Sequence, residues 1–195
     1  MGRVVIDIGC GERKHPGAIG LDIARLGAVD VLADITCGLP FRDNSVDEVH
    51  AQHVLEHFDD LVGVMREVYR VCKPGGRFVV TVPHSSSHFM TWRDPTHRRG
   101  LNLSTFEYFD RSTFDGRTFA YYSGVNFRRV YARLRFVAGG NKGRYAVNRR
   151  FVSALFTDML EALANRSPYA QHLCERWWGH WFGIAEAYAV LEAVK

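Results

Sequence analysis

Residues 4–11 read Val4-Val5-Ile6-Asp7-Ile8-Gly9-Cys10-Gly11. An apolar run interrupted only by Asp7 is typical of a strand that is buried on both faces of a parallel sheet. The glycines that follow allow unusual backbone conformations and let a ligand approach the main chain closely. In a doubly wound sheet such a turn lies at the carboxyl edge, where cofactors bind. The stretch therefore predicts a first strand followed by a ligand-binding loop.

The residues that follow alternate short β-rich runs with turn signals and one helical pattern. The predicted strands are 19–23, 29–35, 45–51 and 77–82. A helix is predicted from Asp59 or Asp60 to about Cys72, because its apolar residues recur at helical spacing and Lys73-Pro74-Gly75-Gly76 stops it. This alternation favours a parallel α/β sheet that is covered on both faces.

The second half of the chain is less regular. Between residues 83 and 126 only Ser104–Phe109 suggests a helix, and residues 130–136 then alternate as a half-buried strand. A turn at 139–143 predicts Arg144–Phe151 as the partner strand of a hairpin. From Val152 onward the pattern is helical. The residues that fall on one apolar face are Trp177, Trp181, Ile184, Tyr188 and Leu191. We therefore divide the chain into a domain at 1–151 and a helical extension at 152–195.

Composition and charge limit the classes of protein. The 195 residues are 47% hydrophobic and 24% charged, as in globular domains, and no apolar window is long enough for a transmembrane helix. No secretion signal is recognisable and no Cys-x-x-Cys pair occurs, so we expect a cytoplasmic protein with reduced thiols. Residues 1–60 carry a net charge of −6 and residues 61–195 one of +10, with no acid from Gly116 to Thr157. The basic half is either a solvated face or a surface toward an anionic partner.

Two carboxylates follow the next two predicted strands. Asp22 can accept hydrogen bonds from both ribose hydroxyls of a nucleoside, and Asp34 can accept one from an adenine amino group. Each of them is also a common helix cap or turn residue. A nicotinamide dinucleotide is disfavoured because Lys14 stands where the third glycine of its fingerprint belongs. Together with Asp7, these acids at three successive strand ends indicate an adenosine-containing ligand.

Seven short motifs occur in a fixed order along residues 4–83. They are Asp7-Ile8-Gly9-Cys10-Gly11, Leu21-Asp22-Ile23, Ala33-Asp34-Ile35, Leu39-Pro40-Phe41, Ser45-Val46-Asp47, His53-Val54-Leu55-Glu56-His57 and Lys73-Pro74-Gly75-Gly76. As a set, the motifs resemble the class I S-adenosylmethionine-dependent methyltransferases, in particular small bacterial and archaeal proteins of that group. The expected fold is therefore a reduced doubly wound, Rossmann-like α/β sheet that is mostly parallel, with a C-terminal antiparallel hairpin and a helical tail.

The resemblance implies that S-adenosyl-L-methionine binds and that S-adenosyl-L-homocysteine is the product. The cofactor-binding residues it implies are Asp7, Gly9, Cys10, Gly11, Asp22, Ile23, Asp34, Ile35, His53 and Leu55. The chain departs from the family at Glu12–Ala18, which is too short for the usual crossover helix and contains Pro16 and Gly17. We expect this gap to leave sheet surface exposed, and together with the Trp-rich tail it suggests a homodimer.

A second group of polar residues follows the fifth predicted strand. His97 is the first candidate for a general base and His57 the second, because imidazole exchanges protons near neutral pH. The predicted substrate-binding residues are His84, Asp94, Arg98 and Arg99. The arginines suit a carboxylate or phosphate, although Asp94-Pro95 is also a common turn with solvated neighbours. The histidines lack the spacing of a known metal motif, so no metal is expected.

The sequence thus predicts methyl transfer from S-adenosylmethionine to oxygen, nitrogen or carbon of a small, anionic molecule. One alternative is a methyltransferase that modifies nucleic acid, suggested by the basic half, although no recognisable RNA-binding module is present and nucleic acid is the less favoured partner. The other alternative is a non-catalytic cofactor-binding or scaffold protein, suggested by the shortened segment after the glycine loop.

Overall fold

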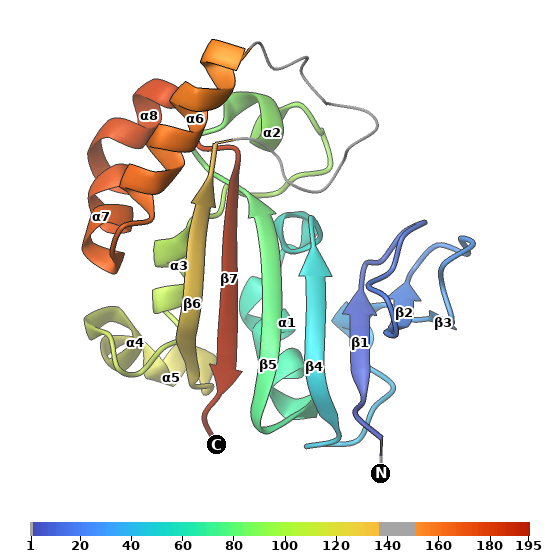
Figure 1. Cartoon of the computed structure of the whole chain (residues 1–195). Coiled ribbons are helices and arrows are strands. Elements are labelled where there is room, and N and C mark those ends of the chain that lie inside the picture. Colours follow the sequence, from blue (N-terminus) through green and yellow to red (C-terminus); the bar gives the residue numbers. More distant parts are fainter. Residues whose placement is uncertain (1, 137–150) are drawn as a thin grey trace.

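The fold is built on one mixed sheet of seven strands (Figure 1). The computed structural model describes the backbone of residues 2–136 and 151–195 and the side chains of 2–136 and 155–195. The strands are β1 (Val5–Ile8), β2 (Ile19–Asp22), β3 (Val31–Leu32), β4 (Val46–Gln52), β5 (Cys72–Pro83), β6 (Phe127–Arg135) and β7 (Glu186–Ala193). Their order is β3-β2-β1-β4-β5-β7-β6, and only β7 runs antiparallel to its neighbours. The predicted α/β class with a mostly parallel Rossmann-like sheet is confirmed.

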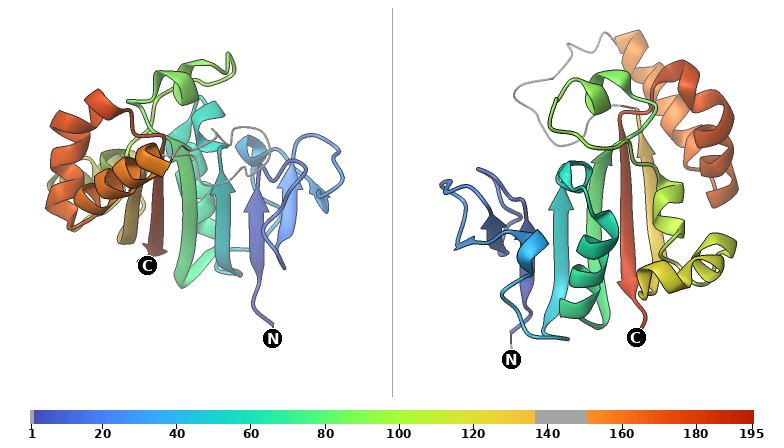
Figure 2. Two further views of the ribbon diagram at one scale, coloured as in Figure 1. Left: turned by 45° about the horizontal axis from the view of Figure 1, so that its top comes forward. Right: turned by 180° about the vertical axis from the view of Figure 1, so that it is seen from behind.

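Helices lie on both sides of the sheet but cover it unequally. They are α1 (Leu61–Val71), α2 (His88–Trp92), α3 (Leu103–Glu107), α4 (Phe114–Thr118), α5 (Ala120–Ser123), α6 (Phe151–Ala164), α7 (Pro168–Leu173) and α8 (Gly179–Phe182), with a π-helical turn at Cys174–Trp178. Figure 2 shows α1 and α3–α5 on one face, whereas α6 lies on the other side beside β6. Among the described residues, no helix therefore lies on the face of β1 and β4 opposite α1.

The hydrophobic core lies between the sheet and α1. Its sheet side is formed by alternate strand residues, among them Ile6, Ile8, Val49, Phe78 and Leu191, all at most 2% exposed. The buried stripe of α1 consists of Leu61, Val64, Met65, Val68 and Val71. The predicted apolar face contained these five residues and Cys72, which instead begins β5. Asp60 caps the helix by accepting a hydrogen bond from the Gly63 N–H. The helix ends at Val71, before the predicted stop.

The connection between β1 and β2 contains no helix, as the length of Glu12–Ala18 predicts. Within the part of the chain that the structure describes, the expectation of a sheet covered on both faces is not met over β1 and β4, where polar side chains lie in place of a helix. Glu48 accepts hydrogen bonds from Arg3 (2.6 Å) and pairs with His50 (2.8 Å), whose ring packs on His15 at a centroid separation of 3.8 Å. Polar groups that bond one another tolerate the loss of a covering helix better than apolar ones.

The end of the chain differs from the helical pattern predicted there. The helical segment stops at Phe182, and Gly183 adopts a positive φ of 65°. Residues 186–193 form β7, with Ala187, Ala189, Leu191 and Ala193 buried on alternate positions. The helical interpretation of Tyr188 and Leu191 was therefore wrong, because a period of two and a period of three to four coincide over so few apolar positions.

The partner of β6 also differs from the prediction. The antiparallel hairpin was predicted to use Arg144–Phe151, of which 144–150 lie outside the described residues and Phe151 begins α6. The strand that pairs with β6 is β7, which is inserted between β5 and β6. The last strand of the predicted C-terminal extension is thus part of the central sheet.

Candidate functional site

The glycine loop after β1 lies at the carboxyl edge of the parallel strands, which is the upper edge of the sheet in Figure 1. Gly9 and Gly11 have φ values of 63° and 56°, in the left-handed region that favours glycine. The Cys10 N–H donates to the Leu21 carbonyl (3.1 Å), and the Gly11 N–H donates to the Asp22 carboxylate (2.9 Å). The loop is therefore fastened to the end of β2 by main-chain and side-chain bonds.

Gly9 and Gly11 differ in the space around them. A Cβ at Gly9 would lie 2.3 Å from Cγ2 of Val54, whereas a Cβ at Gly11 would meet nothing within 4 Å. Val54 cannot yield easily, because a β-branched side chain has a stiff χ1. Gly9 therefore allows the loop to pack directly on the segment that follows β4.

We predict that Gly9→Ala unfolds at a lower temperature than Gly11→Ala. Both variants suffer the left-handed strain of about 1–2 kcal/mol, and Gly9→Ala adds an overpacking cost of about 1–3 kcal/mol. Thermal unfolding measures the difference. Adding Val54→Ala to Gly9→Ala should recover part of the loss but should not help Gly11→Ala; equal stabilities of the two single variants would contradict the packing of Gly9 on Val54.

Asp22 and Ile23 lie at the open end of β2. The carboxylate of Asp22 accepts the Gly11 N–H on Oδ2 and the Ala24 N–H (2.9 Å) on Oδ1. Each carboxylate oxygen has a further lone pair, so both can accept another hydrogen bond. Ile23 is 76% exposed, which leaves an apolar side chain free beside the carboxylate. This pair offers the contacts expected for the ribose and the face of an adenine.

Three other predicted cofactor residues, Asp34, Ile35 and Leu55, have structural roles in the fold. Asp34 caps the 3₁₀ turn Ile35–Cys37 by accepting bonds from the Thr36 hydroxyl (2.7 Å) and N–H (2.9 Å), which hold its pKa below the usual range. Ile35 and Leu55 are buried in the core. Asp34 thus combines the predicted position at a strand end with a capping role, and the side chains of Ile35 and Leu55 do not face an open surface.

Asp7 is buried below the loop. Its carboxylate accepts the His15 N–H (2.7 Å), which ties the connection between β1 and β2 back onto the sheet. Burial raises the pKa of the Asp7 carboxyl, although the hydrogen bond from His15 opposes this shift. The residue therefore supports the loop from beneath, and a ligand would approach from the opposite side.

His53 begins the segment after β4 with a positive φ of 53°, a strained conformation for a residue with a side chain. Its Nε2 lies 2.9 Å from Oε1 of Glu186 and its Nδ1 lies 3.7 Å from Oε1 of Glu56. Burial alone would lower the pKa of His53, but the two carboxylates outweigh it and raise this pKa to about 9. The ring therefore carries a positive charge at neutral pH.

The segment Asp94–Arg99 folds onto the 3₁₀ turn Leu55–His57. The Arg98 N–H donates to the Glu56 carbonyl (2.8 Å), and the rings of His57 and His97 meet edge to face at a centroid distance of 4.7 Å. Thr96 links His57 to Asp94, because its hydroxyl lies 2.9 Å from His57 Nδ1 and donates to Asp94 Oδ1 at 2.6 Å. The two candidate bases, far apart in sequence, thus lie side by side.

The predicted substrate residues do not all lie in one place. His84 is buried, and its two ring nitrogens are engaged by Ser86 (2.8 Å) and Glu175 (3.0 Å). Arg98 and Arg99 both approach Asp59, the first through its carboxylate (3.5 Å) and the second through its carbonyl. His84 therefore anchors the C-terminal helices to β5, whereas Asp94 and the two arginines lie beside His57 and His97.

The sequence analysis missed three buried acids that organise these histidines. Glu56 lies beside both His53 and His97. Glu175 contacts His84, and Glu186 contacts His53. Glu56 stands within His53-Val54-Leu55-Glu56-His57, so a buried acid between two histidines was visible as a signal. Glu175 and Glu186 reach the site only through the fold of the C-terminal segment, which the helical pattern concealed.

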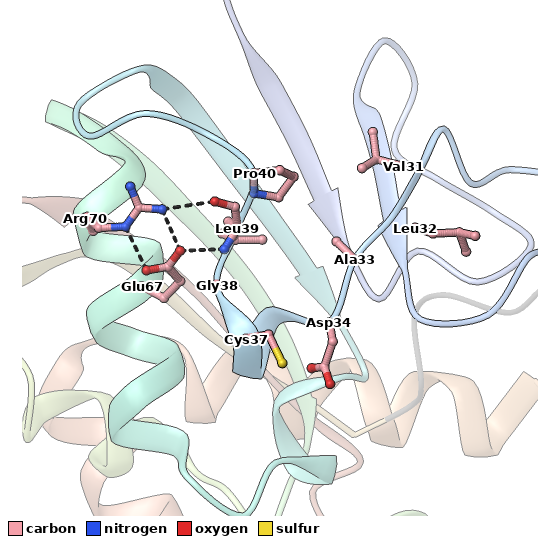
Figure 3. A pocket seen from close by; sticks show the side chains of 10 residues that line it. All are labelled: Val31, Leu32, Ala33, Asp34, Cys37, Gly38, Leu39, Pro40, Glu67 and Arg70. Atoms are coloured by element: carbon pink, nitrogen blue, oxygen red, sulfur yellow. Dashed lines mark hydrogen bonds and ion pairs between the residues drawn. The ribbon is translucent and has the colours of Figure 1, made fainter.

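An open cavity of about 650 Å³ lies between α1 and residues 31–40 (Figure 3). Glu67 and Arg70 of α1 bond each other and the main chain of Leu39, which braces this segment against the helix. The Asp34 carboxylate points away from that pair. Because Gly9, Gly11 and Asp22 do not line the cavity, it borders the edge described above rather than forming it.

Comparisons with known proteins agree with this architecture. A family model described as a methyltransferase domain matches residues 12–80. A probable S-adenosylmethionine-dependent methyltransferase of Mycolicibacterium smegmatis is 35% identical over 124 residues, covering 53% of this chain and 48% of that protein. A 24-methylenesterol C-methyltransferase 2 of Arabidopsis thaliana is 30% identical over 102 residues, covering 40% and 28%. The chain thus spans about half the length or less of these relatives.

Solved structures share the whole fold. A SAM-dependent methyltransferase from Archaeoglobus fulgidus superposes with a TM-score of 0.57 at 19% identity, covering 97% of this chain and 86% of that one. At this identity the likeness concerns the fold alone. Within the described residues, no helix is both long and apolar enough to cross a membrane.

Proposed function

We propose that the chain is a class I S-adenosylmethionine-dependent methyltransferase and that it transfers a methyl group from S-adenosylmethionine to a small, anionic acceptor. The observation that carries this proposal is the bond between the Gly11 N–H and the Asp22 carboxylate, which joins the glycine loop to the acid at the end of β2. The family match spans Asp22, Asp34, His53 and His57, and it begins one residue after Gly11.

The residues of this edge fit the proposed cofactor. Asp22 has free lone pairs for two ribose hydroxyls, Ile23 offers an exposed apolar side chain for adenine, and the open space at Gly11 admits a ligand against the main chain. Cys10 and Asp7 hold the loop in this position from below. When bound, the cofactor would supply a methyl group on a sulfonium, which is already a strong methyl donor.

The acceptor would lie beside the packed segments 53–57 and 94–99, at the edge of the sheet that also carries the glycine loop. The imidazolium of His53 and the guanidinium groups of Arg98 and Arg99 bring positive charges to this region, beside the carboxylates of Glu56, Asp59 and Asp94. Within the described residues, Nε of Arg99 is buried without a hydrogen-bond partner, which leaves one donor of this guanidinium unsatisfied. A carboxylate or phosphate on the substrate satisfies these groups, which supports an anionic acceptor.

The work of the protein in this reaction is mainly to position and desolvate the acceptor. His97 is suited to accept a proton from a protonated acceptor. Its Nδ1 donates to the Thr91 carbonyl (2.6 Å), so the neutral ring presents the lone pair of Nε2. His57 is the second candidate because Thr96 orients its ring beside that of His97.

The test is a methyl-transfer assay with labelled S-adenosylmethionine over pools of carboxylate- and phosphate-bearing metabolites. We expect label in a small molecule together with formation of S-adenosylhomocysteine. Label in RNA or DNA would favour the nucleic-acid alternative instead, with binding that falls steeply with salt. Cofactor binding without transfer to any pool would favour the scaffold alternative.

The nucleic-acid alternative finds little support on β6. Three of its arginines, Arg128, Arg133 and Arg135, pair with Glu192, Glu161 and Glu186 at 2.6, 3.1 and 3.3 Å. Carboxylates that neutralise these side chains leave them less available for phosphate contacts. The basic stretch that prompted this alternative is therefore partly compensated within the described residues.

The homodimer stays a prediction, and its basis moves to the C-terminal helices. The sheet face that we expected to expose apolar surface is polar over β1 and β4, whereas Leu155, Met159, Trp177, Trp181 and Phe182 are all at least 48% exposed. Exposed apolar side chains grouped on neighbouring helices are typical of interfaces. Light scattering at micromolar concentration should give twice the chain mass, and a monomeric mass would count against the dimer.

A further inference from the structure

Glu56 is a buried acid with an unusual environment. Only 1% of the residue is exposed, and neither carboxylate oxygen has a hydrogen-bond partner among the described residues. The side-chain nitrogens His53 Nδ1 and His97 Nε2 lie 3.7 Å and 3.8 Å from Glu56 Oε1. A buried carboxylate normally accepts several hydrogen bonds, because leaving it bare costs free energy. The charged ring of His53 lies too far away for a hydrogen bond, so both oxygens of Glu56 are free to bind a cation placed between these side chains.

The histidines beside Glu56 are held by their outer nitrogens. Nδ1 of His97 donates to the Thr91 carbonyl (2.6 Å), so in the neutral ring Nε2 is an acceptor that faces Glu56, another acceptor. The Thr96 hydroxyl donates to Asp94, so it accepts the hydrogen bond from Nδ1 of His57. Outer partners of this kind, a main-chain carbonyl or a hydroxyl, orient the histidines of metal sites.

The same three side chains converge closely. One nitrogen of His57, one nitrogen of His97 and one carboxylate oxygen of Glu56 all lie within 4.8 Å of one another. Ligand atoms bound at about 2.0–2.1 Å to a tetrahedral cation lie about 3.4 Å apart. Modest rotations of the side chains would close the remaining gap, and Asp94 Oδ2, at 4.0 Å from His97 Nε2, lies near enough to join the site.

We propose that Glu56, His57 and His97 bind a divalent transition-metal ion of the Zn²⁺ kind. Two imidazoles and one carboxylate form a mixed nitrogen–oxygen set that suits such ions and leaves coordination positions open. No metal was expected from the sequence because its histidines lack the spacing of a known metal motif, and His97 indeed lies forty residues after His57. The fold supplies what the spacing lacks, since the Arg98 N–H bonds the Glu56 carbonyl and brings the two segments together.

A metal ion at this site would also limit the chemical class of the methyl acceptor, an inference that rests on the proposed methyl transfer. An ion at Glu56 would lie on the segment that packs against Gly9 through Val54, and thus next to the cofactor loop. Its open positions would take an oxygen of the acceptor. An acceptor with two neighbouring oxygens, such as a hydroxyl beside a carboxylate, is favoured over an amine.

Metal binding can be measured without cofactor or acceptor. The full chain is stripped with EDTA, dialysed and titrated with Zn²⁺ by calorimetry. We expect one ion per chain, and we expect Glu56→Gln and His97→Ala each to weaken binding by at least about 10-fold. His88→Ala is the matched control, because His88 is an exposed histidine on α2 outside the cluster, and its affinity should equal that of the wild type.

Two further readouts guard against misfolding and against confusion with the proposed function. Thermal unfolding of the metal-free variants shows whether they fold, and Co²⁺ in place of Zn²⁺ should give a visible absorption spectrum that His57→Ala alters. S-adenosylhomocysteine is titrated into the metal-free protein separately, so loss of cofactor binding cannot be mistaken for loss of the metal. Absence of Zn²⁺ binding at millimolar concentration would overturn the proposal. So would folded Glu56→Gln and His97→Ala variants that bind Zn²⁺ as tightly as the wild type.

Discussion

Replacing His97 by alanine is expected to lower turnover by about 10²–10⁴-fold while cofactor affinity stays nearly unchanged. His97 faces Glu56 and touches the ring of His57, at the place where the acceptor is proposed to lie. The loss follows whether the imidazole takes the proton of the acceptor directly or holds an ion that binds the acceptor oxygen. Steady-state kinetics with the acceptor found in the transfer assay, and calorimetry with S-adenosylhomocysteine, give the two quantities.

His88→Ala serves as the control, because it removes an exposed imidazole of the same region without touching the cluster. If His97 only positions the substrate, the Michaelis constant should rise and turnover should fall less. A His97→Ala enzyme with full turnover and an unchanged Michaelis constant would remove the segment Asp94–Arg99 from the acceptor site.

Asp22→Ala is expected to weaken binding of S-adenosylhomocysteine by about 1.5–3 kcal/mol, which is about 10–150-fold in affinity. The carboxylate has two roles. It would bind the ribose hydroxyls, and it accepts a hydrogen bond from the Gly11 N–H of the loop. Calorimetry on the folded variant measures the change. Asp43→Ala is the matched control, since Asp43 is an exposed acid that pairs with Arg70 away from the loop.

Asp22→Asn separates the two contributions. The amide oxygen can still accept the Gly11 N–H, but the neutral group forms weaker bonds to the hydroxyls, so we expect an intermediate affinity. If Asp22→Ala binds as tightly as the wild type, Asp22 does not contact the ribose, and the role given to the end of β2 is wrong.

The N-terminal part of the fold could be predicted because its signals are local. The apolar run before Gly9, the periodic face of α1 and the stop after Val71 each depend on a few neighbouring residues, and the structure confirms them. The shortness of Glu12–Ala18 likewise excluded a crossover helix. The sequence did not indicate what replaces that helix, namely the polar contacts among Arg3, Glu48 and His50. Arg3 reaches Glu48 only because β1 pairs with β4, and strand pairing is not visible in the sequence.

The C-terminal part could not be predicted because its structure depends on contacts between residues that are distant in the sequence. β7 takes its place in the sheet by pairing with β5 and β6, and it begins more than fifty residues after the end of β6. Its alanines fit a helix or a strand equally well. Because β7 was missed, Glu186 was not seen as the partner of His53. The contact of Glu56 with His97 was also hidden, since it depends on how the segment after β5 folds back over the end of β4.

The central claim is that the edge formed by the glycine loop and Asp22 binds S-adenosylmethionine, and calorimetric titration of the wild-type chain with S-adenosylhomocysteine tests it most directly. The geometry at Gly9, Gly11 and Asp22 predicts saturable binding with one molecule per chain, lost in part in Asp22→Ala and retained in Asp43→Ala. A folded wild-type chain that shows no binding at millimolar ligand would contradict the assignment of this edge and, with it, the proposed methyl transfer.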